Sequence, residues 1–267
     1  LKALRERIGL DEDDKIRTVS MQTYFPSAPI DKDYSVDEEI AVIYAEGTIM
    51  GGEAETGSVG SAKYTRIIRD LREDDDIKAI VLRVNSPGGS ALASEDIWHE
   101  LELTKEAGKP VVVSMGDLAA SGGYYIAANA DSIFASPSTL TGSIGVFAMM
   151  PQVQELFNEK LGIHMATVRT GPLSAAFSPF YEFSKKEALI FQGEINKTYA
   201  RFKQRVSEGR NMTPEQVEEI AQGRVWTGQA ALNVGLVDGL GELDRALSSA
   251  ATLAALEEYR IKEYPKV

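Results

Sequence analysis

Three short runs of apolar, mostly β-branched residues most constrain what this chain can fold into. They occupy residues 40–44, 79–84 and 110–115, and apolar side chains follow one another in them with few interruptions. Such runs are typical of strands in a parallel sheet that is covered on both faces. Apolar residues recur at helical spacing over 67–71, and a helix is expected over about 90–107. The alternation of strand and helix in βαβ units predicts an α/β fold.

The rest of the chain extends this alternation. The further elements that we expect are strands at 133–135, 144–147 and 166–168 and helices over about 184–208, over 214–221 and after Thr227. We divide the 267 residues into a lead-in over 1–38, one domain over 39–250 and a carboxy-terminal tail over 251–267.

The composition excludes several classes of function. The formal net charge is -12 and the pI is near 4.8, so a nucleic acid would be repelled from most of the surface. The absence of cysteine excludes thiol catalysis, disulfides and thiolate metal sites. We interpret Asp74, Asp75 and Asp76 as solvated charges at a helix end, because consecutive side chains diverge instead of converging on one ion. We expect neither a metal nor a cofactor, and no apolar run is long enough to span a membrane.

Two loops carry the residues best suited to chemistry. The loop over 85–90 follows the second apolar run and contains Gly88 and Gly89, whereas the loop over 116–125 follows the third run and contains Ser121. Parallel sheets bind ligands at the carboxyl ends of their strands, where both loops are expected. N–H groups at the expected helix start beside Ser121 are suited to stabilising an oxyanion. On pattern alone, the first loop also fits an ordinary turn, and Ser121 also fits a helix N-cap.

Several blocks of sequence decide between these interpretations. The blocks are V-N-S-P-G-G at 84–89, S-M-G-D at 114–117, A-A-S-G-G-Y-Y at 119–125, P-S-T-L-T-G-S-I-G-V at 137–146, W-T-G-Q-A at 226–230 and G-L-V-D at 235–238. In order and spacing they resemble the signal peptide peptidase A family. The resemblance implies a Clp-protease/crotonase-like fold, with repeated β-β-α/βαβ units and flanking helices. It also implies a serine-lysine dyad that degrades cleaved signal peptides at the membrane.

The resemblance assigns roles to single residues. Ser121 is the implied nucleophile, and Gly122 and Gly88 are the implied donors of the two oxyanion N–H groups. Ser143 corresponds to the serine that helps to hold the lysine amine, although its place among glycines also fits a plain turn. The apolar residues that we take as the lining of substrate pockets are Leu92, Leu118 and Tyr124.

The lysine of the dyad is missing from the matching position. Ser174 stands where self-contained members of the family carry the lysine. Lys185 and Lys186 open an expected helix among polar neighbours, where a lysine stays protonated. His99 and His164 do not lie just downstream of the serine, where histidine-using relatives of this fold carry their base. The long form of the family has two tandem copies, the first contributing lysine and the second serine, so we interpret the chain as the second copy.

We therefore expect a serine endopeptidase whose active site is shared with an upstream lysine-bearing copy, which leaves the isolated chain weakly active or inactive. Its expected substrates are signal peptides and other apolar, extended peptides. The resemblance implies a homo-oligomeric ring, such as a tetramer, at the periplasmic face of the bacterial inner membrane, held by an anchor outside this chain. Two alternatives stay open: a crotonase-like acyl-CoA enzyme, which needs no serine nucleophile, and a non-catalytic scaffold subunit.

Overall fold

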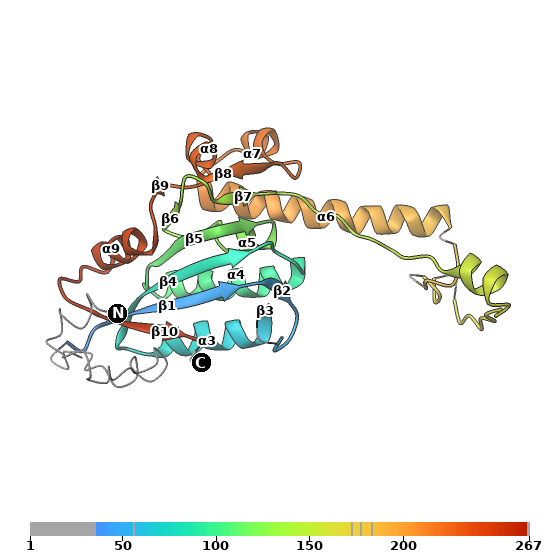
Figure 1. Cartoon of the computed structure of the whole chain (residues 1–267), viewed down its shortest axis with the longest axis horizontal. Coiled ribbons are helices and arrows are strands. Elements are labelled where there is room, and N and C mark those ends of the chain that lie inside the picture. Colours follow the sequence, from blue (N-terminus) through green and yellow to red (C-terminus); the bar gives the residue numbers. More distant parts are fainter. Residues whose placement is uncertain (1–35, 56, 172, 177, 183, 266–267) are drawn as a thin grey trace, which may run out of the picture. The chain divides into compact units, whose positions relative to one another are not determined.

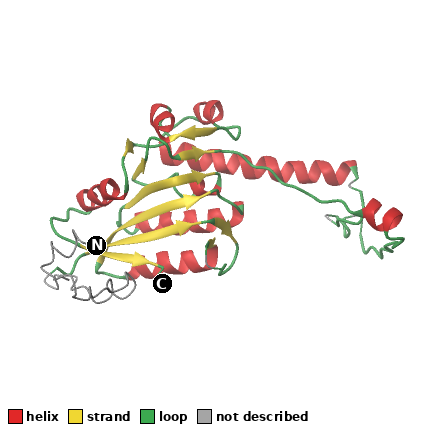
Figure 2. Ribbon diagram, in the orientation of Figure 1, coloured by secondary structure: helices red, strands yellow, loops and turns green. Residues whose placement is uncertain are grey.

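The computed structural model of the chain describes residues 36–55, 57–171, 173–176, 178–182 and 184–265 (Figure 1). The lead-in predicted over 1–38 therefore lies outside the described residues, except for its last three positions. Strands and helices alternate along most of the described part (Figure 2), which confirms the α/β class.

Most strands of the described part belong to one sheet. In chain order the strands are β1 (Glu39–Glu46), β2 (Thr48–Met50), β3 (Ser58–Gly60), β4 (Ile77–Ser86), β5 (Val111–Ala120), β6 (Ser132–Ala135), β7 (Leu140–Gly142), β8 (Val225–Thr227), β9 (Gly239–Leu240) and β10 (Arg260–Tyr264). The main sheet is parallel, with the order β10-β1-β4-β5-β6-β9. β7 pairs in parallel with the end of β5, and β8 pairs antiparallel with β7. The strands predicted at 40–44, 79–84, 110–115 and 133–135 are confirmed as β1, β4, β5 and β6.

Alternate residues of the central strands pack against opposite faces of the sheet. On β1, Ile40 and Val42 belong to the apolar cluster that includes α9 (Leu243–Leu253). Ala41 and Ile43 belong to the larger cluster on the other face, with α3 (Ser61–Glu73) and α4 (Ala91–Glu106). Because both faces are covered, these strands are continuously apolar and do not alternate with polar residues.

Four predicted helix starts are confirmed, and the side chain of a serine or threonine caps each of these four. Ser90 caps α4, and its hydroxyl accepts a backbone hydrogen bond from the first turn. The other predicted helices are α6 (Lys185–Arg210), capped by Ser184, α7 (Pro214–Ile220), capped by Thr213, and α8 (Gly228–Asn233), capped by Thr227. A short helix, α5 (Gly122–Tyr125), follows β5, and a π-helical turn occupies Leu156–Lys160.

Two predicted strands are wrong. Residues 144–147 and 166–168 have no strand structure, and the strand that is present, β7, ends at Gly142. Of the two segments only Ile144 is buried, whereas Phe147 and Val168 are 89% and 97% exposed. Their apolar residues therefore have no neighbouring strand to pair with inside this sheet.

The tail predicted over 251–267 is not separate from the domain. α9 continues to Leu253, and β10 pairs in parallel with β1 at the edge of the sheet. Glu39 on β1 accepts from Arg260 and Lys262 on β10, both at 2.9 Å. These ion pairs allow a five-residue strand with three charged residues to join a buried neighbour.

Residues 145–201, which we call the arm, connect β7 with the packed part of α6. None of its described residues is buried. Its most exposed large apolar side chains are Phe147, Met149, Val168 and Leu189, at 89%, 80%, 97% and 75%. The arm therefore presents an uncovered apolar surface. Burying one such side chain against a partner would contribute about 1.5–3 kcal/mol of stabilisation. Within the described residues, no helix combines the length and the hydropathy that crossing a membrane requires.

Candidate active site

Two loops meet at the carboxyl ends of β4 and β5. The two strands are neighbours, and Ser86 at the end of β4 lies opposite Ala119 near the end of β5. The loop over 87–90 leads from β4 into α4, whereas Ser121 alone separates β5 from α5. The sheet therefore brings the two loops singled out from the sequence to the same edge.

Ser121 is held in a strained backbone conformation. Its φ of 52° and ψ of -119° are those of the first central residue of a type II′ turn, which favours glycine. Such conformations cost about 1–3 kcal/mol. The main chain holds it, because its N–H donates to the carbonyl of Gly142 and its carbonyl accepts from Tyr125, both at 2.9 Å. The hydroxyl does not cap α5, so the interpretation of Ser121 as a plain N-cap is wrong.

The glycines of the two loops are in close contact. A Cβ on Gly88, which has a φ of 91°, would lie 2.4 Å from the nitrogen of Gly122 and 2.9 Å from Cβ of Ser121. A Cβ on Gly122 would lie 2.5 Å from Oγ of Ser94 and 3.1 Å from the nitrogen of Gly89. Only glycine at both positions lets the loops approach this closely.

The two N–H groups predicted to hold the oxyanion, those of Gly122 and Gly88, differ in their hydrogen bonding. The N–H of Gly88 donates to Oγ of Ser86 at 3.1 Å, and that hydroxyl donates to the carbonyl of Gly47 at 2.6 Å. The N–H of Gly88 is therefore engaged inside its own loop, which argues against its predicted role as an oxyanion donor. The N–H groups of Gly89 and Gly122 have no acceptor among the described residues, and they lie close together. The geometry favours Gly89 as the partner of Gly122.

Ser143 lies beside Ser121 because both are attached to β7. Gly142, the last residue of β7, accepts the N–H of Ser121, and Ser143 follows directly with a φ of 47°. The N–H of Ser143 donates to the carbonyl of Arg224 at 2.8 Å. Both serines line the same cleft, which has a volume of about 940 Å³.

The cleft joins all four residues to which the resemblance gave catalytic roles. Its lining includes Ser121, Gly88, Gly122 and Ser143. Sequence reasoning missed its aromatic lining, which consists of Tyr125, Phe147, Tyr199 and Phe202. Tyr199 and Phe202 stand three residues apart on one face of α6, and this spacing was the only sequence signal for them.

None of the residues predicted to line substrate pockets lines this cleft. Tyr124 is fully buried, its hydroxyl donates to the carbonyl of Leu236 at 2.8 Å, and burial raises its pKa. Leu92 is 71% exposed in the first turn of α4, and Leu118 is half-buried within β5. The structure corrects the prediction for Tyr124, because a fully buried side chain cannot contact a substrate, whereas Leu92 and Leu118 lie outside this cleft.

The cleft contains the hydroxyl of Ser121 but, among the described residues, no side chain suited to act as a base. No lysine, histidine, aspartate or glutamate of the described part lines it. Ser174, at the vacant lysine position, is exposed, and its hydroxyl donates to the carbonyl of Gly171 at 2.9 Å. The other bases considered from the sequence are all exposed and outside the cleft: Lys185, Lys186, His99 and His164.

An ion pair supports the aromatic lining from behind. Arg205 on α6 donates to Glu95 on α4 at 2.7 Å, and its guanidinium lies 3.9 Å from the ring centroid of Trp98. The hydroxyl of Tyr125 donates to Glu95, and the Tyr125 ring lies 4.7 Å from that of Phe202. Burial, with the hydrogen bond to Glu95, raises the pKa of Tyr125, so its hydroxyl is neutral and cannot serve as the base.

Comparison with known proteins places this geometry in a family. The family model described as Peptidase family S49 matches residues 103–257, and the Clp protease model matches residues 32–140. The chain belongs to peptidase family S49. The family recognised from the sequence blocks is thereby confirmed.

Two curated proteases and one solved structure are similar to this chain. Protease 4 of Salmonella typhi is 46% identical over 98% of this chain and 42% of its own length. Serine protease SPPA, chloroplastic, of Arabidopsis thaliana is 38% identical over 92% of this chain and 37% of its own length, so the chain spans about two-fifths of these relatives. A mutant of ClpP1 from Listeria monocytogenes has a TM-score of 0.52 at 17% identity, covering 77% of this chain and 94% of that protein. This likeness confirms the predicted Clp-like fold.

Proposed function

We propose that the chain is the serine-bearing part of a serine-lysine endopeptidase that degrades signal peptides and other apolar, extended peptides. One observation carries the proposal: the strained Ser121 stands in a cleft beside the N–H groups of Gly89 and Gly122, and no described residue there can act as a base. With Ser121 as the nucleophile and Gly89 and Gly122 as the oxyanion cradle, the component that this mechanism still needs is a proton acceptor.

The proposed reaction is acyl transfer. Oγ of Ser121 attacks the carbonyl carbon of the scissile bond, and its proton passes to a neutral lysine amine. The tetrahedral oxyanion accepts hydrogen bonds from Gly122 and Gly89, and removing one such donor typically costs about 2.7–4 kcal/mol of transition-state stabilisation. The lysine then protonates the leaving amine, and water hydrolyses the acyl-enzyme.

The lysine comes, in this proposal, from an upstream copy of the same fold. The uncharged cleft leaves room for an incoming amine, and Ser143 stands beside Ser121 where its hydroxyl can hold that amine. An apolar cleft also disfavours the protonated form of a lysine, which lowers the pKa of its amine toward neutrality. The length of the Salmonella relative, of which the chain covers 42%, leaves room for such a copy.

The lining of the cleft supports an apolar, extended substrate. It combines aromatic rings with small residues and contains no charged side chain of the described part. Apolar lining with a few polar groups is typical of sites that bind extended apolar chains. A charged substrate side chain would lose its hydration there without gaining a partner.

The arm supports an assembly of several copies. We place its exposed apolar side chains, including Phe147 and Val168, against another copy within a homo-oligomeric ring such as a tetramer. We place the assembly at the periplasmic face of the bacterial inner membrane, where cleaved signal peptides arise.

Hydrolysis by the natural polypeptide that contains this chain tests the proposed function. Ser121→Ala should lower kcat on an apolar peptide by at least about a thousandfold, because the attacking atom is lost. Ser138→Ala is the matched control, since Ser138 is exposed and outside the cleft, and it should cleave like the wild type. Retained cleavage by Ser121→Ala would refute the proposal, and so would coenzyme A binding without any peptidase activity.

A further inference from the structure

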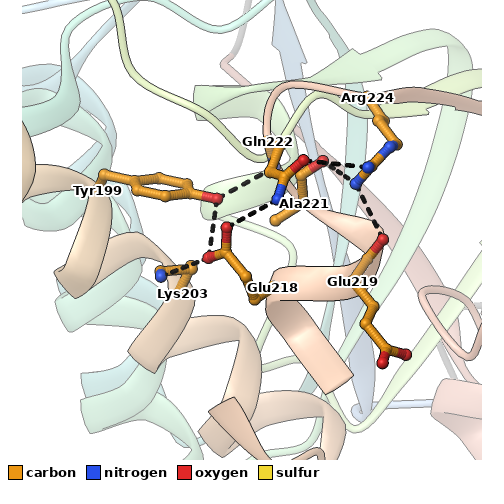
Figure 3. Close-up of polar contacts among 7 residues, drawn as sticks. All are labelled: Tyr199, Lys203, Glu218, Glu219, Ala221, Gln222 and Arg224. Atoms are coloured by element: carbon orange, nitrogen blue, oxygen red, sulfur yellow. Dashed lines mark hydrogen bonds and ion pairs between the residues drawn. The ribbon is translucent and has the colours of Figure 1, made fainter. Parts of the chain in front are cut away.

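A polar network stands behind one wall of the cleft, where α6 meets α7 (Figure 3). Its centre is the carboxylate of Glu218 on α7. This carboxylate accepts from the Tyr199 hydroxyl at 3.2 Å, the Lys203 amine at 2.6 Å and the side-chain amide of Gln222 at 3.0 Å. The Lys203 amine also lies 4.5 Å from the centroid of the Tyr199 ring. One carboxylate thus gathers side chains from a neighbouring helix and from the turn after its own.

That turn contains a strained residue. Gln222 and Gly223 have φ values of 59° and 74°, and a left-handed conformation costs a residue other than glycine about 1–2 kcal/mol. The N–H of Gln222 donates to the Tyr199 hydroxyl at 3.1 Å, and its side-chain oxygen accepts from Arg224 at 3.0 Å. Together with the bond to Glu218, these contacts hold Gln222 in place at the wall of the cleft (Figure 3).

The same turn supports the segment that carries Ser143. The N–H of Ser143 donates to the carbonyl of Arg224, and the N–H of Gly223 donates to the carbonyl of Ile144 at 2.9 Å. A Cβ on Gly145 would lie 2.9 Å from Cα of Gly223, so the two segments are in contact. Two main-chain hydrogen bonds and this contact therefore couple the turn to the segment that carries Ser143.

We propose that Glu218 is a positioning residue that fixes the Ser143 hydroxyl, and through it the catalytic amine. The inference rests on the proposed function, in which Ser143 holds that amine. Glu218 touches no reacting atom and acts through the Gln222 turn. Removing its carboxylate leaves three donors without their acceptor, and the turn relaxes. A displacement of about 1 Å at a catalytic group lowers the rate by up to about a hundredfold.

The ionisation of Glu218 suits this role. Hydrogen bonds from Lys203 first, and then from Gln222, hold the pKa of Glu218 below its usual range. The carboxylate is therefore charged near neutral pH and attracts all its donors.

A double-mutant cycle in the natural polypeptide tests the inference. kcat and KM for an apolar peptide are measured for Glu218→Ala, Ser143→Ala and the double variant. Glu219→Ala is the matched control, because the Glu219 carboxylate points away from the network in Figure 3. We expect Glu218→Ala to lower kcat by about ten- to a hundredfold with little change in KM, and Glu219→Ala to change neither. The double variant should lose no more than Ser143→Ala alone, because Glu218 acts through Ser143.

Losses that multiply in the double variant would overturn the inference, as would a Ser143→Ala variant with unchanged kcat. If Glu218→Ala does not fold, Glu218→Gln replaces it in the cycle, since it keeps the side-chain shape without the charge. Ser121→Ala separates this inference from the proposed function. Activity that survives Ser121→Ala refutes the proposed function. If activity depends on Ser121 but the losses from Glu218→Ala and Ser143→Ala multiply in the double variant, only the role of Glu218 is refuted.

Discussion

Replacing Gly88 by alanine tests how closely the two active-site loops must fit. With a φ of 91°, a Cβ at this position would lie 2.4 Å from the nitrogen of Gly122, 2.8 Å from the oxygen of Ala120 and 2.9 Å from Cβ of Ser121. All three distances are shorter than real Cβ contacts, and two of the three atoms are main-chain atoms. The loops must therefore move apart.

The structure gives the magnitude of this effect. The left-handed conformation costs alanine about 1–2 kcal/mol, and overpacking at a tight contact costs about 1–3 kcal/mol. The free energy of unfolding should therefore fall by about 2–5 kcal/mol, out of about 5–15 kcal/mol for a typical domain. Because the displaced atoms belong to Ser121 and Gly122, peptide hydrolysis should fall by about a hundredfold or more.

Gly108→Ala is the matched control. Gly108 has nearly the same φ, 88°, but a Cβ there would meet nothing within 4 Å. We expect it to lose about 1–2 kcal/mol of unfolding free energy and to cleave peptide at the wild-type rate. Urea unfolding and peptide hydrolysis are measured for both variants in the natural polypeptide. Equal behaviour of the two variants in hydrolysis would show that close contact between the loops does not matter for Ser121.

Three further predictions test the strain, the correction at Tyr124 and the ion pair behind the cleft. Ser121→Gly should abolish cleavage yet raise the free energy of unfolding by about 1 kcal/mol, because the relief of backbone strain exceeds the cost of the added entropy of the unfolded chain. A lower free energy of unfolding would show that Ser121 is not strained. Tyr124→Phe should lower the free energy of unfolding by about 1–3 kcal/mol, because it leaves the buried carbonyl of Leu236 without a donor. It should leave KM unchanged, and a raised KM would show that Tyr124 contacts the substrate after all. Burial alone would raise the pKa of Glu95, but hydrogen bonds led by that from Arg205 lower it below 4.5. The ionised Glu95 therefore stabilises the fold above pH 4.5, and this stabilisation is lost as the pH falls through the lower pKa that Glu95 has in the folded state. The free energy of unfolding of Glu95→Gln should therefore fall less steeply with decreasing pH than that of the wild type. Acid unfolding of both proteins measures this, and the same pH dependence in both would contradict it.

The parts of the fold that the sequence predicted correctly are those in which local pattern and burial agree. β1, β4 and β5 are continuous apolar runs because helices cover both faces of the sheet. The helix starts follow from side-chain caps that act within four residues of the chain. The same locality explains why the site loops were found, since each directly follows a buried strand.

The errors arise where long-range packing decides. The apolar runs at 144–147 and 166–168 predicted strands, but no partner strand lies beside them in this sheet. β10 was missed because three of its five residues are charged, and its pairing involves Glu39, more than 200 residues away. Phe202 enters the cleft only because α6 packs against α5, and no local pattern shows that contact.

The central claim is that Ser121 attacks only when an amine from outside this chain reaches it. Covalent labelling with a fluorophosphonate, which modifies an activated serine, tests this directly when the labelled residue is identified by mass spectrometry. The natural polypeptide and the isolated chain, checked for folding by circular dichroism, are treated side by side. We predict rapid modification of Ser121 in the polypeptide and little or none in the isolated chain. Equally rapid modification of Ser121 in the isolated chain would contradict the claim.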